Sequence, residues 1–143
     1  MKPIRVSPSL TLALLQAREA TMMHFRPILN EMGLTEQQWR VISVLYQYDE
    51  LENNHLADLA CILRPSLTGI LNRMLDQNLI KKRKDLHDQR VSLIQLSDEG
   101  KRYFETQAVK MEESYTDIQT QYGAEKIQQL MELLNDLSKI KPR

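Results

Sequence analysis

The sequence predicts a mainly α-helical chain with one small β hairpin, and three observations support this fold class. Apolar residues recur every three or four positions along most of the 143 residues, as they do on one face of a helix. Alternation of polar and apolar residues is limited to residues 90–96. Four glycines and five prolines are too few for a β sandwich, which needs a turn about every 8–12 residues.

The first helix is predicted over residues 9–32. Its apolar stripe consists of Leu15, Met22, Phe25, Leu29 and Met32. Pro27 lies inside this helix and removes one backbone hydrogen bond, so we expect a bend there. Gly33 follows the stripe and predicts the end of the helix, because glycine adopts the left-handed conformation found at helix C-termini.

A second helix is predicted from Thr35 to Tyr48. Thr35 is a good N-cap, and Gln38 three residues later completes a capping box. Residues 49–54 are polar and predict a loop.

Two short helices follow. The first covers residues 55–63, and the side chains expected on its buried side are Leu56, Leu59, Ala60 and Leu63. Pro65 suits the first turn of the next helix, which runs to Gln77. The side chains expected to face inward from it are Leu67, Ile70, Leu71 and Met74. Asn78 is expected to end this helix in the left-handed conformation.

The hairpin and two more helices complete the chain. Residues 79–84 and 90–96 predict two strands joined by a polar turn. Ser97 then caps a long helix that ends at Gly123. Its apolar seam consists of Phe104, Ala108, Met111, Tyr115, Ile118 and Tyr122. The seam of the last helix consists of Ile127, Leu130, Leu134 and Leu137.

This order of elements is that of a winged helix-turn-helix, and the charge distribution agrees with a DNA-binding role. The formal net charge is zero, but residues 64–97 hold seven basic and three acidic residues. Such a basic patch is typical of nucleic-acid-binding proteins. A helix fits the major groove and reads base edges near its N-terminus. The residues we expect at the DNA are Ser66, Thr68, Gly69, Asn72, Arg73, Lys84, His87, Asp88 and Arg90.

The chain resembles the MarR family of winged-helix transcriptional regulators. The segments that carry the resemblance are Leu34-Thr35, Leu56-Ala57-Asp58-Leu59, Ser66-Leu67-Thr68, Arg73-Met74, Asn78-Leu79-Ile80, Asp88-Gln89-Arg90 and Ser97-Asp98-Glu99-Gly100. The resemblance implies that Asp88 braces the wing while Arg90 enters the minor groove. It also implies one domain over residues 1–143, with residues 34–97 as the DNA-binding part. Gly69 departs from the family pattern, which often has a long polar residue at that position.

A homodimer is the expected assembly. The helices at both ends of the chain carry more apolar surface than a domain of four short elements can cover. Two-fold dimers are the commonest oligomers, and a dimer reads two half-sites about one helical turn apart. We therefore assign residues 8–33 and 98–140 to dimerisation helices.

The N-terminal third has a narrower resemblance, to regulators that repress operons for homoprotocatechuate (4-hydroxyphenylacetate) degradation. The segments involved are 15–20, 25–27 and 34–41. This implies an aromatic carboxylate effector that releases the protein from DNA. Guanidinium groups suit a carboxylate, and apolar side chains suit a ring. The expected ligand residues are Arg18, Met22, His24, Trp39 and Arg40.

Other classes of function have weaker support in the sequence. His24, His55 and His87 lie far apart, so no metal site is expected, and neither a cofactor motif nor a catalytic constellation is present. The N-terminus lacks a signal core and no apolar run spans a bilayer, which predicts a cytoplasmic protein.

Two alternatives to an effector-controlled regulator remain open. The single cysteine, Cys61, is expected to be buried and structural, and a redox-responsive regulator would need it activated. The other alternative is a helical module that binds an acidic protein partner through the basic hairpin.

Overall fold

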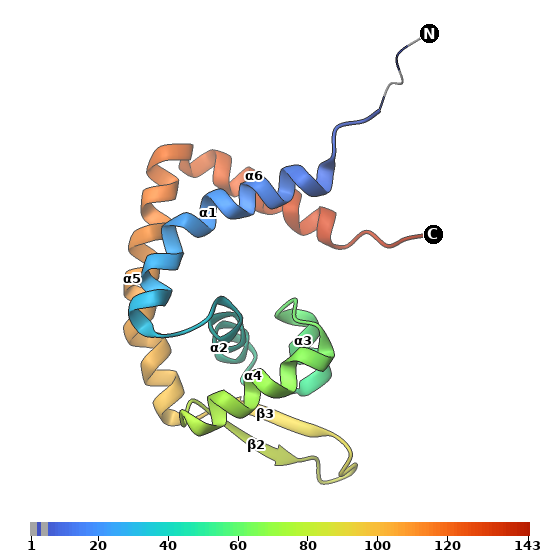
Figure 1. Cartoon of the computed structure of the whole chain (residues 1–143), viewed down its shortest axis with the longest axis vertical. Helices are drawn as coiled ribbons and strands as arrows, with labels where there is room; N and C mark the ends of the chain where they lie inside the picture. Colours follow the sequence, from blue (N-terminus) through green and yellow to red (C-terminus); the bar gives the residue numbers. More distant parts are fainter. Residues whose placement is uncertain (1–2, 4–5) are drawn as a thin grey trace. The chain divides into compact units, whose positions relative to one another are not determined.

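The computed structural model describes residue 3 and residues 6–143, and over these it contains six helices and one three-stranded sheet (Figure 1). The elements are α1 (Leu10–Met32), α2 (Glu36–Tyr48), β1 (Glu50–Glu52), α3 (Asn53–Leu59), α4 (Arg64–Asp76), β2 (Ile80–Lys84), β3 (Ser92–Leu96), α5 (Asp98–Tyr122) and α6 (Ala124–Ser138). This confirms the mainly α-helical class with a winged helix-turn-helix. Residues 1–2 and 4–5, which belong to the N-terminal segment where no signal core is expected, lie outside the described residues.

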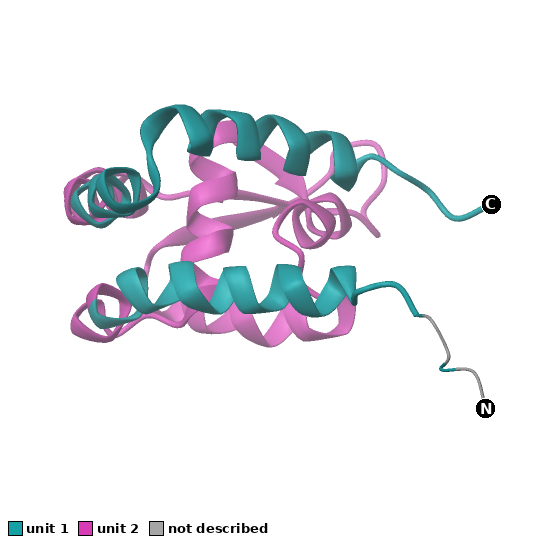
Figure 2. Ribbon diagram, turned by 90° about the horizontal axis from the view of Figure 1, so that it is seen from above, with its two compact units in different colours: residues 1–27, 112–143 teal, residues 28–111 magenta. Residues whose placement is uncertain are grey.

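The chain forms two compact units, coloured separately in Figure 2. Unit 1 consists of residues 1–27 and 112–143, and unit 2 consists of residues 28–111. The boundaries fall within α1 and α5, so each of these helices contributes to both units. Unit 2 contains the whole predicted DNA-binding part, residues 34–97.

Unit 2 is built around an antiparallel sheet in the order β1-β3-β2. Leu51 of β1 pairs with Ile94 of β3, and Ile80 of β2 pairs with Leu96. Because strand side chains alternate between faces, these four apolar residues share one face. They are buried with apolar residues of α2, α3 and α4, among which the inward side of α4 is as predicted: Leu67, Ile70, Leu71 and Met74.

The helix boundaries of unit 2 follow local sequence signals. Thr35 Oγ1 accepts from the Gln38 backbone N–H at 3.1 Å, and Gln38 Oε1 accepts from the Thr35 N–H at 3.1 Å, so the capping box is confirmed. Gly33 and Asn78 have φ angles of 68° and 59°, as expected for left-handed residues at helix ends. Ser97 Oγ accepts from the Gly100 N–H at 2.9 Å and caps α5.

Unit 1 contains α6 and parts of α1 and α5, and it leaves large apolar side chains exposed. Within its described residues, Ile127 is the only buried hydrophobic side chain. The exposed ones on its helices are Leu10, Leu12, Leu14, Leu15, Met23, Tyr122, Leu130, Met131 and Leu133. This surface is the apolar excess that the sequence predicts for the terminal helices.

The predicted loop over residues 49–54 is wrong. Residues 50–52 form β1, and α3 already begins at Asn53. The strand exists because it pairs with β3 and buries Leu51, a contact between segments distant in sequence. The predicted hairpin is therefore two strands of a three-stranded sheet.

The prediction for the end of the following helix is also wrong. Helix α3 ends at Leu59, and Cys61 adopts a φ of 55°. This turn shifts the helical phase, so Ile62 is buried and Leu63 is 78% exposed. Cys61 itself is exposed and free, which contradicts the expectation of a buried structural thiol.

Candidate functional site

Helix α4 presents the predicted DNA-reading residues on its solvent face. The opposite face of this helix packs in the core. The exposed residues are Ser66, Thr68, Gly69, Asn72 and Arg73. Gly69 has open space where a Cβ would be, so an incoming surface can approach the backbone closely. Helix α4 contacts β2, so this face and the hairpin belong to one compact unit.

An exposed ion pair bridges the turn that precedes α4. Arg64, the first residue of α4, donates to both carboxylate oxygens of Asp58 on α3, at 2.9 Å and 3.3 Å. A bidentate pair restricts the orientation of the two side chains more than a single hydrogen bond does. The hydrogen bond from Arg64 also holds the pKa of Asp58 below its usual range. Asp58 was not among the predicted site residues, because its role depends on the turn between two helices.

The tip of the hairpin is organised by two carboxylates. Asp85 Oδ1 accepts from the backbone N–H groups of His87 and Asp88, at 2.7 Å and 3.2 Å. Asp88 Oδ1 accepts from the Arg90 backbone N–H at 3.0 Å and from its Nε at 3.1 Å. These bonds lower the pKa of both carboxyl groups. The Arg90 side chain is 92% exposed and His87 is exposed, so both are accessible to a large ligand.

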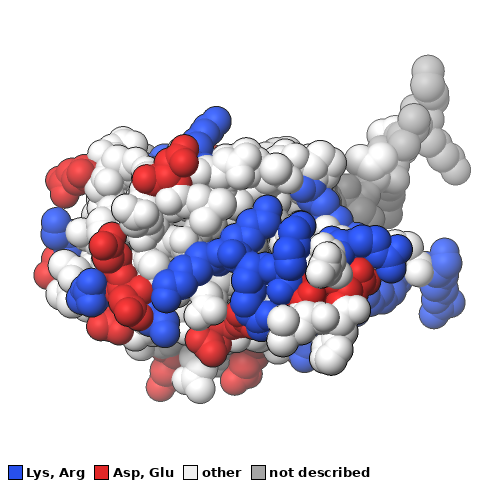
Figure 3. Space-filling view, turned by 90° about the horizontal axis from the view of Figure 1, so that it is seen from below, with Lys and Arg blue, Asp and Glu red and all other residues white. Residues whose placement is uncertain are grey.

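Basic side chains of β2 border this turn. Lys81, Lys82, Arg83 and Lys84 are all exposed. Figure 3, which views the molecule from below, shows a band of Lys and Arg side chains across that face. Arg83 is not free within this run, since its guanidinium binds Glu50 of β1. The hydrogen bond to Glu50 raises the pKa of Arg83.

The predicted ligand residues of unit 2 lie on α2. Trp39 is stacked on Phe104 of α5, with ring centroids 5.2 Å apart, and Tyr46 stacks on the same ring at 4.3 Å. Arg40 Nη1 lies 3.6 Å from Glu36 Oε1. The Arg40 Nε is buried and has no hydrogen-bond partner among the described residues. A buried donor without a partner is costly, so the Arg40 Nε retains the capacity to bond one further acceptor.

The Oε1 of Gln107 on α5 is also buried, and no residue that the structure describes bonds to it. The predictions did not include this residue. Its position three residues after Phe104 is the one available signal, because it places an amide beside an apolar seam.

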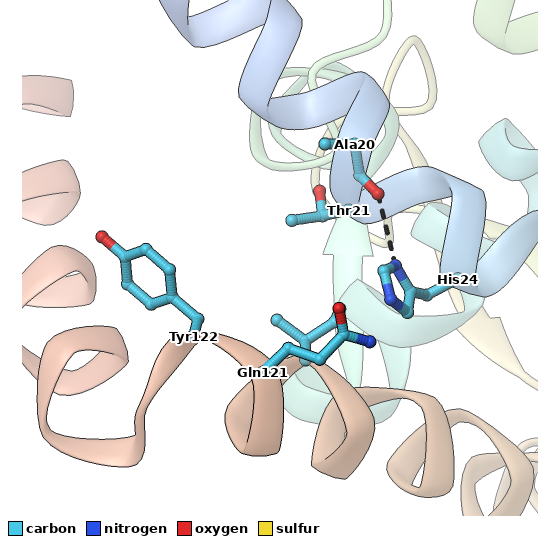
Figure 4. A pocket seen from close by; sticks show the side chains of 6 residues that line it. Ala20, Thr21, His24, Gln121 and Tyr122 are labelled. Atoms are coloured by element: carbon cyan, nitrogen blue, oxygen red, sulfur yellow. Dashed lines mark hydrogen bonds between the residues drawn. The ribbon is translucent and has the colours of Figure 1, made fainter.

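The predicted ligand residues of unit 1 are only partly brought together. His24 lines an open hollow of about 300 Å³, with Ala20, Thr21, Ile118, Gln121 and Tyr122 (Figure 4). His24 Nδ1 lies 3.2 Å from the Ala20 carbonyl oxygen, and its Nε2 lies 3.3 Å from Asp117 Oδ2. Met22 is half-buried but does not line this hollow. Arg18 Nη1 lies 3.6 Å from Glu19 Oε1, so the Arg18 guanidinium faces a carboxylate of its own helix.

Within the described part of the chain, no group of three or more His, Cys, Asp or Glu side chains is arranged to hold a metal ion. None of its helices is both long and apolar enough to cross a lipid bilayer.

Comparisons with known sequences agree with this architecture. The model of the MarR family matches residues 34–92. The homoprotocatechuate degradative operon repressor of Escherichia coli is 48% identical over 128 residues, which cover 90% of this chain and 86% of that protein. The regulator FarR of Neisseria gonorrhoeae is 44% identical over 132 residues, which cover 92% of this chain and 90% of that protein.

Solved structures give the same result for the fold. Transcriptional regulator PA4135 has a TM-score of 0.93 and 52% identity, covering 95% of this chain and all of that one. NadR in complex with 4-hydroxyphenylacetate has a TM-score of 0.87 and 42% identity, covering 99% of this chain and all of that one. Both similarities extend across the two compact units of the chain.

Proposed function

This chain belongs to the MarR family of transcriptional regulators, and we propose that it is a homodimeric repressor of an operon for aromatic-acid degradation. A regulator of this family is not an enzyme. We further propose that a small phenolic carboxylate releases it from operator DNA in the cytoplasm. The observation that carries this proposal is the 42% identity, over nearly the whole chain, to NadR bound to 4-hydroxyphenylacetate.

DNA binding is assigned to α4 and the wing, the hairpin formed by residues 80–96. The hydroxyl, amide and guanidinium groups on the exposed face of α4 suit base edges and phosphates. At the wing, Lys84, His87 and Arg90 are exposed, and Asp88 orients Arg90. Arginine at this place suits the negative potential of a narrow minor groove.

Dimerisation is assigned to the exposed apolar helices of unit 1. Monomeric proteins rarely expose contiguous apolar patches beyond a few hundred Å². Nine large apolar side chains on the described helices of unit 1 are exposed, which supports a second copy as their cover. A two-fold dimer would present two copies of α4 to successive half-sites.

We place the effector at α2, with its carboxylate at Arg40 and its ring against Trp39. The unpartnered Arg40 Nε supports this choice, because a carboxylate supplies the missing acceptor. The unpartnered Gln107 Oε1 suits a phenolic hydroxyl donor. Arg18, Met22 and His24 form the second candidate set, on unit 1. Release from DNA requires that the effector bind the DNA-free conformation more tightly.

The test combines thermal denaturation and gel shifts with 4-hydroxyphenylacetate. The duplex probe is selected by the protein itself from a random pool. Wild type is expected to gain about 2.7 kcal/mol of unfolding free energy at a hundredfold excess over Kd. Arg40→Ala should lose this gain and the release of DNA while still binding the probe. Arg102→Ala, which removes an exposed arginine of α5 outside both ligand sets, is the control.

Three outcomes discriminate between the assignments. No stabilisation of wild type would contradict the aromatic-carboxylate effector. Normal induction of Arg40→Ala together with loss of induction in Arg18→Ala or His24→Ala would move the effector to unit 1. Failure of wild type to select any duplex would contradict the DNA-binding role.

A redox-responsive regulator is the second candidate, and the exposure of Cys61 favours it. An exposed thiol in the turn before α4 is accessible to oxidants, whereas a buried one is not. The Cys61→Ser variant tests this candidate, since release of DNA by peroxide from wild type but not from the variant would support it. The organic hydroperoxide resistance regulator of Bacillus subtilis is 27% identical over 84 residues. A protein-binding module without DNA contact is set aside because of the family assignment.

A further inference from the structure

One ion pair of the wing ties the two edges of the sheet together. Arg83 on β2 donates to Glu50 on β1, with Nη2–Oε1 and Nε–Oε2 distances of 2.7 Å and 3.1 Å. In the sheet order β1-β3-β2 these strands are separated by β3. The pair therefore spans the central strand and joins residues that are not neighbours in the ladder.

The register shows which face the pair occupies. Glu50 pairs with Gln95 and Arg83 pairs with Leu93, so both side chains lie on the face opposite the buried Ile94. Lys82, which pairs with Ile94, and Lys84 lie on the other face. The four basic side chains of β2 are thus divided between the faces, with Lys82 and Lys84 on one side and Lys81 and Arg83 on the other, where Glu50 binds Arg83.

The ladder between β2 and β3 joins the two strands of the wing, and the Arg83–Glu50 pair adds a link from β2 to the third strand, β1. Strand β1 has only three residues, and a two-stranded hairpin alone is marginally stable and strongly twisted. A bidentate pair across the sheet restricts that twist. Glu50 also stands just beyond the end of α2, after Asp49, whose φ is 69°. The carboxylate therefore extends from a half-buried position next to the end of α2 to Arg83 on the edge strand β2.

We propose that Glu50 is a positioning residue for DNA binding, which acts through Arg83 to hold the wing, and that this pair persists in the DNA complex. The proposal rests on the DNA-binding role given above. Its consequence is that Arg83, although it lies within a basic run, does not contact phosphate. The phosphate contacts of this strand belong to lysines on the other face, such as Lys84.

The dependence of DNA affinity on salt separates these roles. Each lost phosphate contact lowers the slope of log K against log salt by about 0.9, hence by about 1.8 in a dimer. We expect Lys84→Gln to show this decrease. Arg83→Gln removes the same charge one residue away and should leave the slope unchanged, with affinity reduced about two- to thirtyfold, since an exposed ion pair contributes about 0.2–1 kcal/mol and occurs twice in the dimer. Circular dichroism confirms that both variants are folded.

A charge exchange provides the second readout. The variants Glu50→Arg and Arg83→Glu should each weaken operator binding, and the double variant should recover wild-type affinity to within about twofold, because the pair is restored. If Arg83 contacts phosphate, the double variant is the weakest binder and Arg83→Gln shows the slope of Lys84→Gln. Either result overturns the proposal. Absence of salt-dependent duplex binding by wild type would instead contradict the DNA-binding role itself.

Discussion

The two compact units differ in what they do with large apolar side chains. Unit 2 buries a continuous core that includes Leu45, Leu56 and Ile94, each at most 1% exposed. Unit 1 buries Ile127 alone among its described residues, while leucines of α1 and α6 remain open to solvent. The chain therefore contains one unit with a core of its own and one whose core needs further surface.

The sequence pattern alone does not show which apolar helices build a core within the chain and which are left for assembly. Both units contain helices with apolar residues at helical spacing, so periodicity alone does not distinguish them. In unit 2 the apolar face of the sheet packs with the helices to complete the core. The described part of unit 1 contains helices only. An amphipathic helix without a sheet or a further helix to cover it is available for a second copy.

The largest expected effect is on assembly. Leu12→Glu combined with Leu133→Glu replaces two exposed leucines of unit 1 by charges. Each leucine buried in a two-fold interface contributes roughly 1.5–3 kcal/mol and occurs twice, so the dimer dissociation constant should rise more than about a hundredfold. Sedimentation velocity across a concentration series measures this change.

The matched control for the assembly prediction lies in unit 2. Leu63 and Leu86 are 78% and 87% exposed, and Leu63→Glu combined with Leu86→Glu makes the same chemical change. This control should leave the dimer intact. Equal dissociation of both double variants would remove the proposed contrast between the units.

The next effect concerns packing inside unit 2. A Cβ at Gly100 would collide with the backbone carbonyl of Leu79, which accepts from the Ser97 N–H at 3.0 Å. The Gly100→Ala substitution should therefore lower the free energy of unfolding by about 1–3 kcal/mol, the usual effect of overpacking. Urea unfolding measures the loss. If the free energy of unfolding changes by less than about 0.5 kcal/mol, the backbone at Leu79 moves aside easily, and the packing around Gly100 is looser than we infer.

Local signals predicted much of unit 2. The capping box at Thr35 and the left-handed residues Gly33 and Asn78 depend on residues adjacent in the chain, and all three were correct. The exposed face of α4 followed from its 3.6-residue period. Strand β1 was missed because its pairing with β3 is not local and three residues give no periodic signal.

The candidate site was predicted less completely than the fold. The residues that point to solvent on α4 and the wing turn were found by pattern and resemblance. The pairs Asp58–Arg64 and Glu50–Arg83 were not, because each depends on two elements meeting in the folded chain. Cys61 was wrongly expected to be buried, since a turn with positive φ interrupted the helical period used to judge it.

Gly69, on the exposed face of α4, is the counterpart of the closely packed Gly100 in unit 2. Nothing lies within 4 Å of a Cβ built at Gly69, and its φ is negative, unlike that of Gly33. The Gly69→Ala substitution should raise the free energy of unfolding by roughly 0.5–1 kcal/mol, because alanine favours the helix. Operator affinity should fall in the same variant, since the methyl group stands on the face assigned to DNA. Unchanged affinity for specific and random duplexes would show that α4 does not approach DNA closely at this residue.

The smallest effect is confined to the wing turn and follows from the lowered pKa of Asp85. Hydrogen bonds from the backbone N–H groups of His87 and Asp88 stabilise the ionised carboxyl group. Because the pKa is lower in the folded turn than in an open one, the ionised carboxylate stabilises the turn above the ordinary pKa of aspartate. That contribution is lost as the pH falls through the lowered pKa. Acidification should therefore open the wing turn while the core of unit 2 stays folded.

Amide hydrogen exchange measures this prediction at single residues. Exchange of the His87 and Asp88 amides, corrected for the intrinsic rate at each pH, should accelerate as Asp85 becomes protonated. The amide of Gln38, which is bonded to the neutral hydroxyl of Thr35, should not respond. Asp85→Asn keeps a side-chain acceptor but has no titratable group, so its wing turn should lose the pH dependence. If the turn in this variant opens with the same pH profile as wild type, the titration belongs to Asp88 and its bond with Arg90 instead.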